Sequence, residues 1–114
     1  MGYYEPYGEI PPKDRDISRA ITSLREELEA VDYYNQRAAV SSDSKLSELM
    51  IHNRDEEIEH AAMLIEWLRR EMPEFDKELR QYLFTESSLV AVEAGAAPAA
   101  AVSVPGLNIG SLKK

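Results

Sequence analysis

The sequence predicts an all-α fold, in which an antiparallel hairpin of two long helices is followed by a short third helix. Two long segments repeat apolar residues at spacings of three and four, and a short polar turn separates them. A third helix of about twelve residues cannot cover both exposed sides of such a hairpin. The pattern therefore also predicts self-association, through more than one kind of interface.

Composition restricts the classes of function. The 114 residues include 13 Lys and Arg against 21 Asp and Glu, and the formal net charge of −8 favours cations as partners over nucleic acid or anionic membranes. The chain has no cysteine, which excludes disulfides and thiolate metal sites and leaves oxygen and nitrogen ligands. The first residues do not resemble a signal peptide, and no apolar run approaches the ~20 residues of a membrane span. We expect a soluble, cytoplasmic protein.

The first half of the chain divides into an arm, a helix and a turn. Residues 1–13 contain Pro6, Pro11 and Pro12 and are expected to form an irregular arm. A helix is predicted over 14–40, where the apolar positions are Ile17, Ala20, Ile21, Leu24, Leu28, Val31, Tyr34 and Ala38. The polar residues 41–44 then form a turn that can cap the next helix.

The second half is predicted to begin with a helix over 45–72, which Pro73 ends. Its main apolar stripe is Leu46, Leu49, Met50, Leu64, Trp67 and Leu68, and a second strip on another side is Ile51, Ile58, Ala62 and Ile65. The third helix is expected over 74–85, while 86–93 is ambiguous. We group 14–93 as one helical domain, followed by an Ala/Pro-rich flexible linker over 94–105 and a short tail over 106–114.

Two ionisable residues fall within the apolar stripe of the second predicted helix. At about 100° per residue, Glu57 and His60 lie among the leucines of the main stripe, at central positions. Their spacing brings the two side chains within ~5–6 Å, close enough to bind one ion. An isolated buried carboxylate is costly unless it is neutralised, paired or bound to a metal. Glu27, at the edge of the first helix's stripe, supplies a third candidate ligand.

An ordinary structural role is the alternative for each of these residues. Glu-x-x-His arises often by chance in an acidic helical chain, and Glu57 and His60 could pair with each other or with an arginine across an interface. A solvated acidic face is the favoured interpretation of Glu26, Glu29, Asp55, Glu56 and Glu59. Core packing is favoured for Trp67 and Tyr82.

The ligand pattern matches half of a known kind of site. Ferritin-like di-iron bundles take a single Glu from each of two helices and Glu-x-x-His from each of the other two. One copy of this hairpin would supply Glu27, Glu57 and His60 once, so two copies related by a two-fold axis would complete a four-helix bundle and the site within it. Such ligands suit redox iron, and zinc, manganese or calcium could also bind in vitro.

Longer stretches resemble one family, the encapsulated ferritins. The similar segments are EELEAVDYYNQRA (26–38), HNRDEEIEHAAMLIEWLRR (52–70) and QYLFTE (81–86), within a resemblance that covers roughly 17–93. The tail, GLNIGSLKK, resembles the targeting peptide that docks cargo inside an encapsulin shell. The residues that match that peptide's pattern are Gly106, Leu107, Ile109, Gly110, Ser111 and Leu112.

The resemblance implies roles for individual residues. Glu27, Glu57 and His60 match the family's ferroxidase-centre ligands, shared between two subunits, and Tyr34 matches an aromatic residue near the metals. Tyr33 stands where some members have Trp. Glu26 and Glu29 match acidic positions proposed as a metal entry site. The family assembles as a ring of dimers, commonly a decamer, and works inside the encapsulin compartment.

The expected function is therefore a ferroxidase that oxidises Fe²⁺ to Fe³⁺ with O₂ and serves iron storage and detoxification as encapsulin cargo. Two alternatives stay open at this stage. A rubrerythrin-like di-iron peroxidase or other oxidoreductase would turn over peroxide with a reductant and make no mineral. A non-enzymatic acidic helical assembly protein would use Glu57 and His60 in interfacial ion pairs and would bind no metal tightly.

Overall fold

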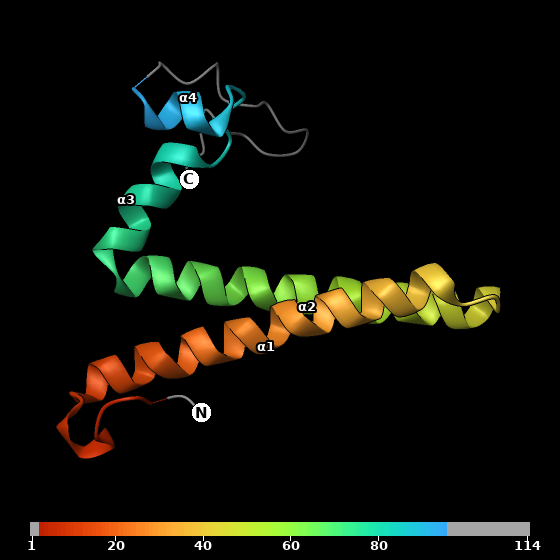
Figure 1. Cartoon of the computed structure of the whole chain (residues 1–114), viewed down its shortest axis with the longest axis horizontal. Coiled ribbons are helices and arrows are strands. Elements are labelled where there is room, and N and C mark those ends of the chain that lie inside the picture. The colour runs from red at the N-terminus through yellow and green to blue at the C-terminus, as the bar shows by residue number, and fades with distance from the viewer. Residues whose placement is uncertain (1–2, 96–114) are drawn as a thin grey trace. The chain divides into compact units, whose positions relative to one another are not determined.

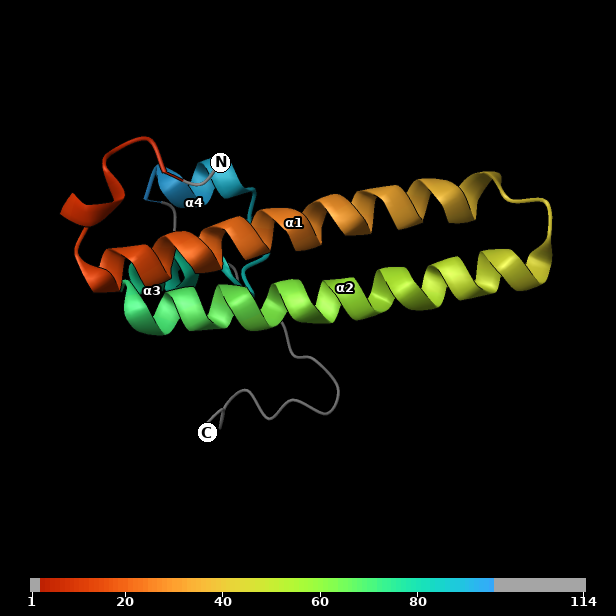
Figure 2. The same cartoon turned by 90° about the horizontal axis from the view of Figure 1, so that it is seen from below.

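The computed structural model describes residues 3–95 and contains helices and turns, with no strand among those residues. Within residues 3–95 the chain forms two compact units, one that ends at Pro73 and one that begins at Glu74. Helix α1 (Pro12–Val40) and helix α2 (Ser44–Glu71) lie side by side and antiparallel in the first unit (Figures 1 and 2). The predicted all-α hairpin is confirmed.

The turn between α1 and α2 is held by side chains of its own residues. The carboxylate of Asp43 caps α2 by accepting hydrogen bonds from the backbone N–H groups of Lys45 and Leu46, at 2.9 and 3.3 Å. The Ser47 hydroxyl then donates to the carbonyl of Ala38 at 2.9 Å, which joins the start of α2 to the end of α1. These contacts fix where the chain reverses, and hence which residues of α1 face which residues of α2.

The packed seam of the hairpin is narrow. Ala20 of α1 is buried, as are Ala61 and Leu68 of α2, and Leu68 is fully buried. The small alanine side chains allow the two helix backbones to approach closely, and most other seam residues stay half-buried. Large apolar side chains elsewhere in the first unit remain well exposed, among them Leu28, Leu46, Leu49, Ile51, Ile58 and Met63. The hairpin by itself therefore leaves much of its apolar surface uncovered.

Helix α1 starts two residues earlier than the sequence predicted. Pro12 occupies its first position, where a proline loses no hydrogen bond and its fixed φ suits the helix. The arm before it contains a 3₁₀ turn, Tyr7–Glu9, and is attached to α1 by two arginines. Arg15 donates to the Tyr7 carbonyl at 3.1 Å and stacks 4.1 Å from the Tyr7 ring, and Arg19 donates to the Tyr7 hydroxyl at 2.9 Å.

The second unit holds helix α4 (Leu89–Glu93) and all of helix α3 (Pro73–Tyr82) apart from its first residue. Helix α3 ends three residues before the predicted end, because Phe84 adopts a left-handed backbone with φ of 62° that cannot continue a helix. The Thr85 hydroxyl donates to the Tyr82 carbonyl at 2.7 Å at this end. The segment 86–93, which the sequence left ambiguous, contains helix α4 in its last five residues. The Ser88 hydroxyl caps this helix by accepting a hydrogen bond from the N–H of Ala91.

No helix in the described part of the chain is long and apolar enough to cross a membrane. Residues 96–105 of the predicted linker and the predicted targeting peptide, 106–114, lie outside the described residues.

Candidate metal centre

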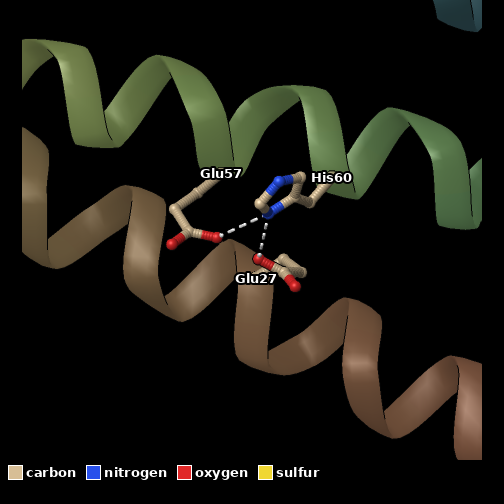
Figure 3. A group of neighbouring side chains, drawn as sticks. All are labelled: Glu27, Glu57 and His60. Carbon is tan, nitrogen blue, oxygen red and sulfur yellow. Dashed lines mark hydrogen bonds and ion pairs between the residues drawn. The ribbon is translucent and has the colours of Figure 1, made fainter.

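Glu27, Glu57 and His60 come together where the middle of α1 faces the middle of α2. The Nδ1 atom of His60 lies 3.2 Å from the Glu57 carboxylate and 3.5 Å from the Glu27 carboxylate (Figure 3). One ligand atom from each residue lies within 4.8 Å of the others. The i, i+3 spacing places Glu57 and His60 on neighbouring turns of α2, and the antiparallel pairing of the helices brings Glu27 opposite them.

The three side chains lie at the edge of the packed seam. The side chains of Glu27 and Glu57 are 25% and 24% exposed, whereas that of His60 is 46% exposed. The sequence placed His60 centrally in its stripe, but in one hairpin it stands at the rim, because a single neighbouring helix covers only part of a wide stripe. The cluster therefore opens toward the side of the hairpin that nothing in the chain's first unit covers.

The electrostatics of the cluster follow from two carboxylates that face one imidazole. The pKa of Glu27 is raised by its hydrogen bond with Glu57 and by partial burial. The pKa of Glu57 is lowered by that hydrogen bond and by a second one with His60. The hydrogen bond to Glu57 and the charge of both carboxylates raise the pKa of His60 above 6.5, against a smaller opposing effect of burial. The opposite shifts of Glu27 and Glu57 show that the two carboxylates are coupled, and the pair titrates as one system.

The three side chains provide a donor set that suits a divalent cation. Two carboxylate oxygens and one imidazole nitrogen are the donor types that bind iron, zinc and manganese in proteins. The three atoms are close enough to share one ion, and a cation would remove the repulsion between the carboxylates. The residues present fit one single-Glu position and one Glu-x-x-His position of a two-metal site in a four-helix bundle, which is half of the ligand set.

A shallow depression of about 440 Å³ adjoins the cluster. Glu27 and His60 form part of its wall, and the remaining lining residues are Ser23, Met63, Leu64 and Trp67. Trp67, which the sequence assigned to the core, is 37% exposed, because this side of α2 has no covering helix in the first unit. Ser23 and Met63 were not predicted as part of the site. Their spacing was a usable signal, because Ser23 precedes Glu27 by one helical turn and Met63 follows His60 by three residues.

Other predicted site residues lie outside the three-residue cluster. Tyr34 follows Glu27 by seven residues, or about 10 Å along the helix, and its ring lies 5.5 Å from the Arg37 guanidinium. Glu26 and Glu29 are both exposed, and Glu29 accepts a hydrogen bond from the Tyr33 hydroxyl at 2.9 Å. This hydrogen bond also raises the pKa of Tyr33. Roles for these residues in metal transfer stay predictions.

The acidic residues assigned to a solvated face are exposed as expected. Asp55, Glu56 and Glu59 all lie on the surface of α2. Asp55 pairs with Arg54 at 2.9 Å, and Glu56 lies 3.5 Å from the exposed imidazole of His52. Such exposed pairs add little stability.

The fold and the cluster define a class: a helical hairpin with a Glu/Glu/His cluster that could hold a metal ion. Comparison with known proteins agrees with this class. Residues 2–86 match the EncFtn-like family, and the chain belongs to that family. The chain is 46% identical to an encapsulated ferritin-like protein of Rhodospirillum rubrum, over 96% of this chain and 86% of the relative.

Two further similarities support the assignment. A ferritin-like protein of Thermotoga maritima is 53% identical over 91 residues, which is 80% of each chain. A crystal structure of a Nitrosomonas europaea protein superposes with a TM-score of 0.76 at 58% identity, and covers 78% of this chain and 98% of that one. The family resemblance inferred from the sequence is confirmed.

Proposed function

We propose that the protein is a ferroxidase whose di-iron centre forms between two copies of the hairpin. The observation that carries this proposal is the convergence of Glu27, Glu57 and His60 at an open edge of the hairpin, with half of a bundle's ligand set. A second copy related by a two-fold axis would bring the same three residues to the opposite side. Membership of the EncFtn-like family supports this interpretation.

The exposed apolar residues support the pairing of hairpins. Trp67 and Met63, at the cluster, are 37% and 63% exposed. Leu49 precedes His60 by eleven residues, about three helical turns, so it lies on the same side of α2, and it is 51% exposed. A second hairpin on this side would bury these side chains together with the metal ligands. The exposed strip around Ile51 and Ile58, on another side of α2, would then serve a second interface in a ring of dimers.

In the proposed reaction Fe²⁺ is the substrate and dioxygen is the electron acceptor. Glu57 and Glu27 balance the charge of the incoming cations, and their carboxylates favour the more highly charged Fe³⁺ product. Iron would bind the deprotonated Nδ1 of His60 and the deprotonated carboxylates, and the raised pKa values of Glu27 and His60 set protons in competition with it. Iron affinity should therefore fall as the pH is lowered.

The test of this proposal is aerobic iron oxidation by variants that remain assembled. Glu57→Ala and His60→Ala should each abolish fast oxidation of Fe²⁺, because each removes a ligand from both halves of the site. Glu66→Ala, in a carboxylate–arginine cluster elsewhere on α2, serves as the matched control and should keep the wild-type rate. Wild-type rates in both ligand variants would refute the assignment of the site.

We further propose that the protein is cargo of an encapsulin compartment, within which it stores and detoxifies iron. The support is the similarity of residues 106–114 to a targeting peptide and the name of the Rhodospirillum rubrum relative, an encapsulated ferritin-like protein. Deletion of residues 105–114 should leave iron oxidation intact and abolish loading into co-expressed encapsulin shells. Continued loading of the truncated chain would contradict the targeting role.

A further inference from the structure

Met63 occupies a place that the packing of the hairpin does not explain. It lies two residues after the buried Ala61 and five before the buried Leu68, spacings that put its side chain on a different side of α2 from the seam. The side chain is 63% exposed. It lines the same depression as Glu27 and His60, and its position three residues after His60 makes the two side chains neighbours on the helix surface.

The other methionines of the described chain provide an internal comparison. Met50 and Met72 are both half-buried, and neither lines the depression beside the cluster. Three thioethers of the same intrinsic reactivity therefore differ in their access to any oxidant formed at the cluster. The three methionines differ in access only because they occupy different positions on the hairpin.

We propose that Met63 is a site of methionine sulfoxide formation, coupled to turnover at the Glu27–Glu57–His60 cluster. The inference rests on the proposed ferroxidase function, and the oxidant is hydrogen peroxide. Two Fe²⁺ ions supply one electron each to dioxygen, which takes up two protons and leaves as hydrogen peroxide. The Met63 sulfur then takes one peroxide oxygen as the O–O bond breaks, and the other oxygen leaves as water. The sulfur loses two electrons and the peroxide gains them.

The depression favours this reaction at Met63 over reaction in solution. Peroxide released at His60 would form next to the Met63 thioether, because both side chains line the same depression, and the second hairpin proposed above would cover it. The neighbouring Leu64 and Trp67 keep the surroundings apolar. Oxidation at Met63 should therefore survive an enzyme that removes peroxide only from bulk solution.

The experiment measures sulfoxide at each methionine by peptide mass spectrometry after aerobic turnover of Fe²⁺ with catalase present. The full-length wild-type chain should carry several-fold more sulfoxide at Met63 than at Met50 or Met72. In Glu57→Ala, exposed to the same iron, air and catalase, Met63 should fall to the level of Met72. Met63→Leu should lose the signal, which assigns the modified sulfur to this residue.

Three results would overturn the inference. The first is wild-type iron oxidation with Met63 unmodified, and the second is sulfoxide at Met63 that disappears with catalase. The third is equal sulfoxide in wild type and Glu57→Ala, which would reflect exposure alone. The first of these leaves the ferroxidase proposal standing, whereas a wild-type chain that oxidises no iron refutes that proposal and this inference with it.

Discussion

Helix α2 carries two carboxylate clusters nine residues apart, on nearly opposite sides of the helix, and they differ in how their charge is balanced. Glu66 receives hydrogen bonds from Arg69 at 2.8 and 2.9 Å and from Arg70 at 2.7 Å. These guanidinium groups lower the pKa of Glu66 to about 2. Glu57 instead meets a second carboxylate, Glu27, and one imidazole.

The two clusters differ in whether the protein supplies a permanent cation for the carboxylate, and this difference supports the proposed metal site at Glu57. Arginine is a permanent cation, so the Glu66 cluster is neutralised at every physiological pH. Histidine is neutral above its pKa, so the Glu57 cluster holds two carboxylates with no fixed cation. The two carboxylates also differ in solvation. The Glu66 side chain is 42% exposed and is partly hydrated, whereas the Glu57 side chain is 24% exposed. The less solvated cluster is the one that lacks a cation.

The largest expected effect comes from making the two clusters alike. His60→Arg would give Glu57 and Glu27 the fixed cation that Glu66 already has, and would remove a nitrogen ligand. Metal affinity should fall by more than ~100-fold, as expected for loss of a direct ligand. Titration calorimetry with Co²⁺ or anaerobic Fe²⁺ measures this loss.

The matched control for that substitution lies in the other cluster. Arg70→His places an imidazole beside Glu66, about 15 Å along the helix axis from His60. This variant should bind metal as the wild type does. Equal affinity in wild type and His60→Arg would show that the cluster is not the metal site.

The second prediction concerns the surfaces beside the two clusters. Leu49→Asp puts a carboxylate on the exposed apolar side that carries His60, where burial of an unpaired charge by a second chain costs several kcal/mol. We expect the variant to remain helical and to lose self-association, which light scattering during size-exclusion chromatography measures. Glu48→Asp, one residue earlier and exposed, controls for the low helix propensity of aspartate. An assembly unchanged by Leu49→Asp would place the interface elsewhere.

The third and smallest effect is on acid and base behaviour of the metal-free chain. The pKa of His60 is raised, so its protonated form stabilises the hairpin below about 6.5, and this contribution is lost as pH rises through the higher native pKa. The pKa of Glu66 is lowered, so its contribution is present above about 4.5 and is lost as pH falls toward about 2. Both groups are exposed, so the changes in stability should be small.

Nuclear magnetic resonance titration of the His60 ring tests the first of these shifts directly. Glu57→Gln removes the main partner and should lower the pKa of His60 toward its ordinary value, while Glu66→Gln should leave it unchanged. His52, whose exposed ring lies 3.5 Å from Glu56, is an internal reference in the same spectra. A His60 pKa that is the same in wild type and Glu57→Gln would contradict the electrostatic account.

The hairpin could be predicted from the sequence because the features that determine its helices are local. Apolar periodicity sets α1 and α2, and the Asp43 cap with the short turn sets their antiparallel pairing. The end of α3 could not be predicted, since a left-handed Phe84 carries no glycine signal. The 3₁₀ turn Tyr7–Glu9 was missed for a related reason, because the prolines around it suggested only irregular chain.

The meeting of the three candidate ligands could be predicted from the sequence, whereas their surroundings were harder to predict. Glu27, Glu57 and His60 followed from spacing on two helices and from the family resemblance, and the structure brings them together. The rim position of His60, the exposure of Trp67 and the placement of Met63 did not follow. A helical wheel shows which residues share a face, but the width that one neighbouring helix covers depends on packing.

Native mass spectrometry of the full chain, with and without Fe²⁺ under anaerobic conditions, tests the central claim most directly. If each hairpin holds half of the site, iron should appear only on species with an even number of chains, at about two ions per pair. Single chains should remain free of iron at the same concentration. Single chains that carry the full complement of iron, or paired chains that carry none, would contradict the shared centre.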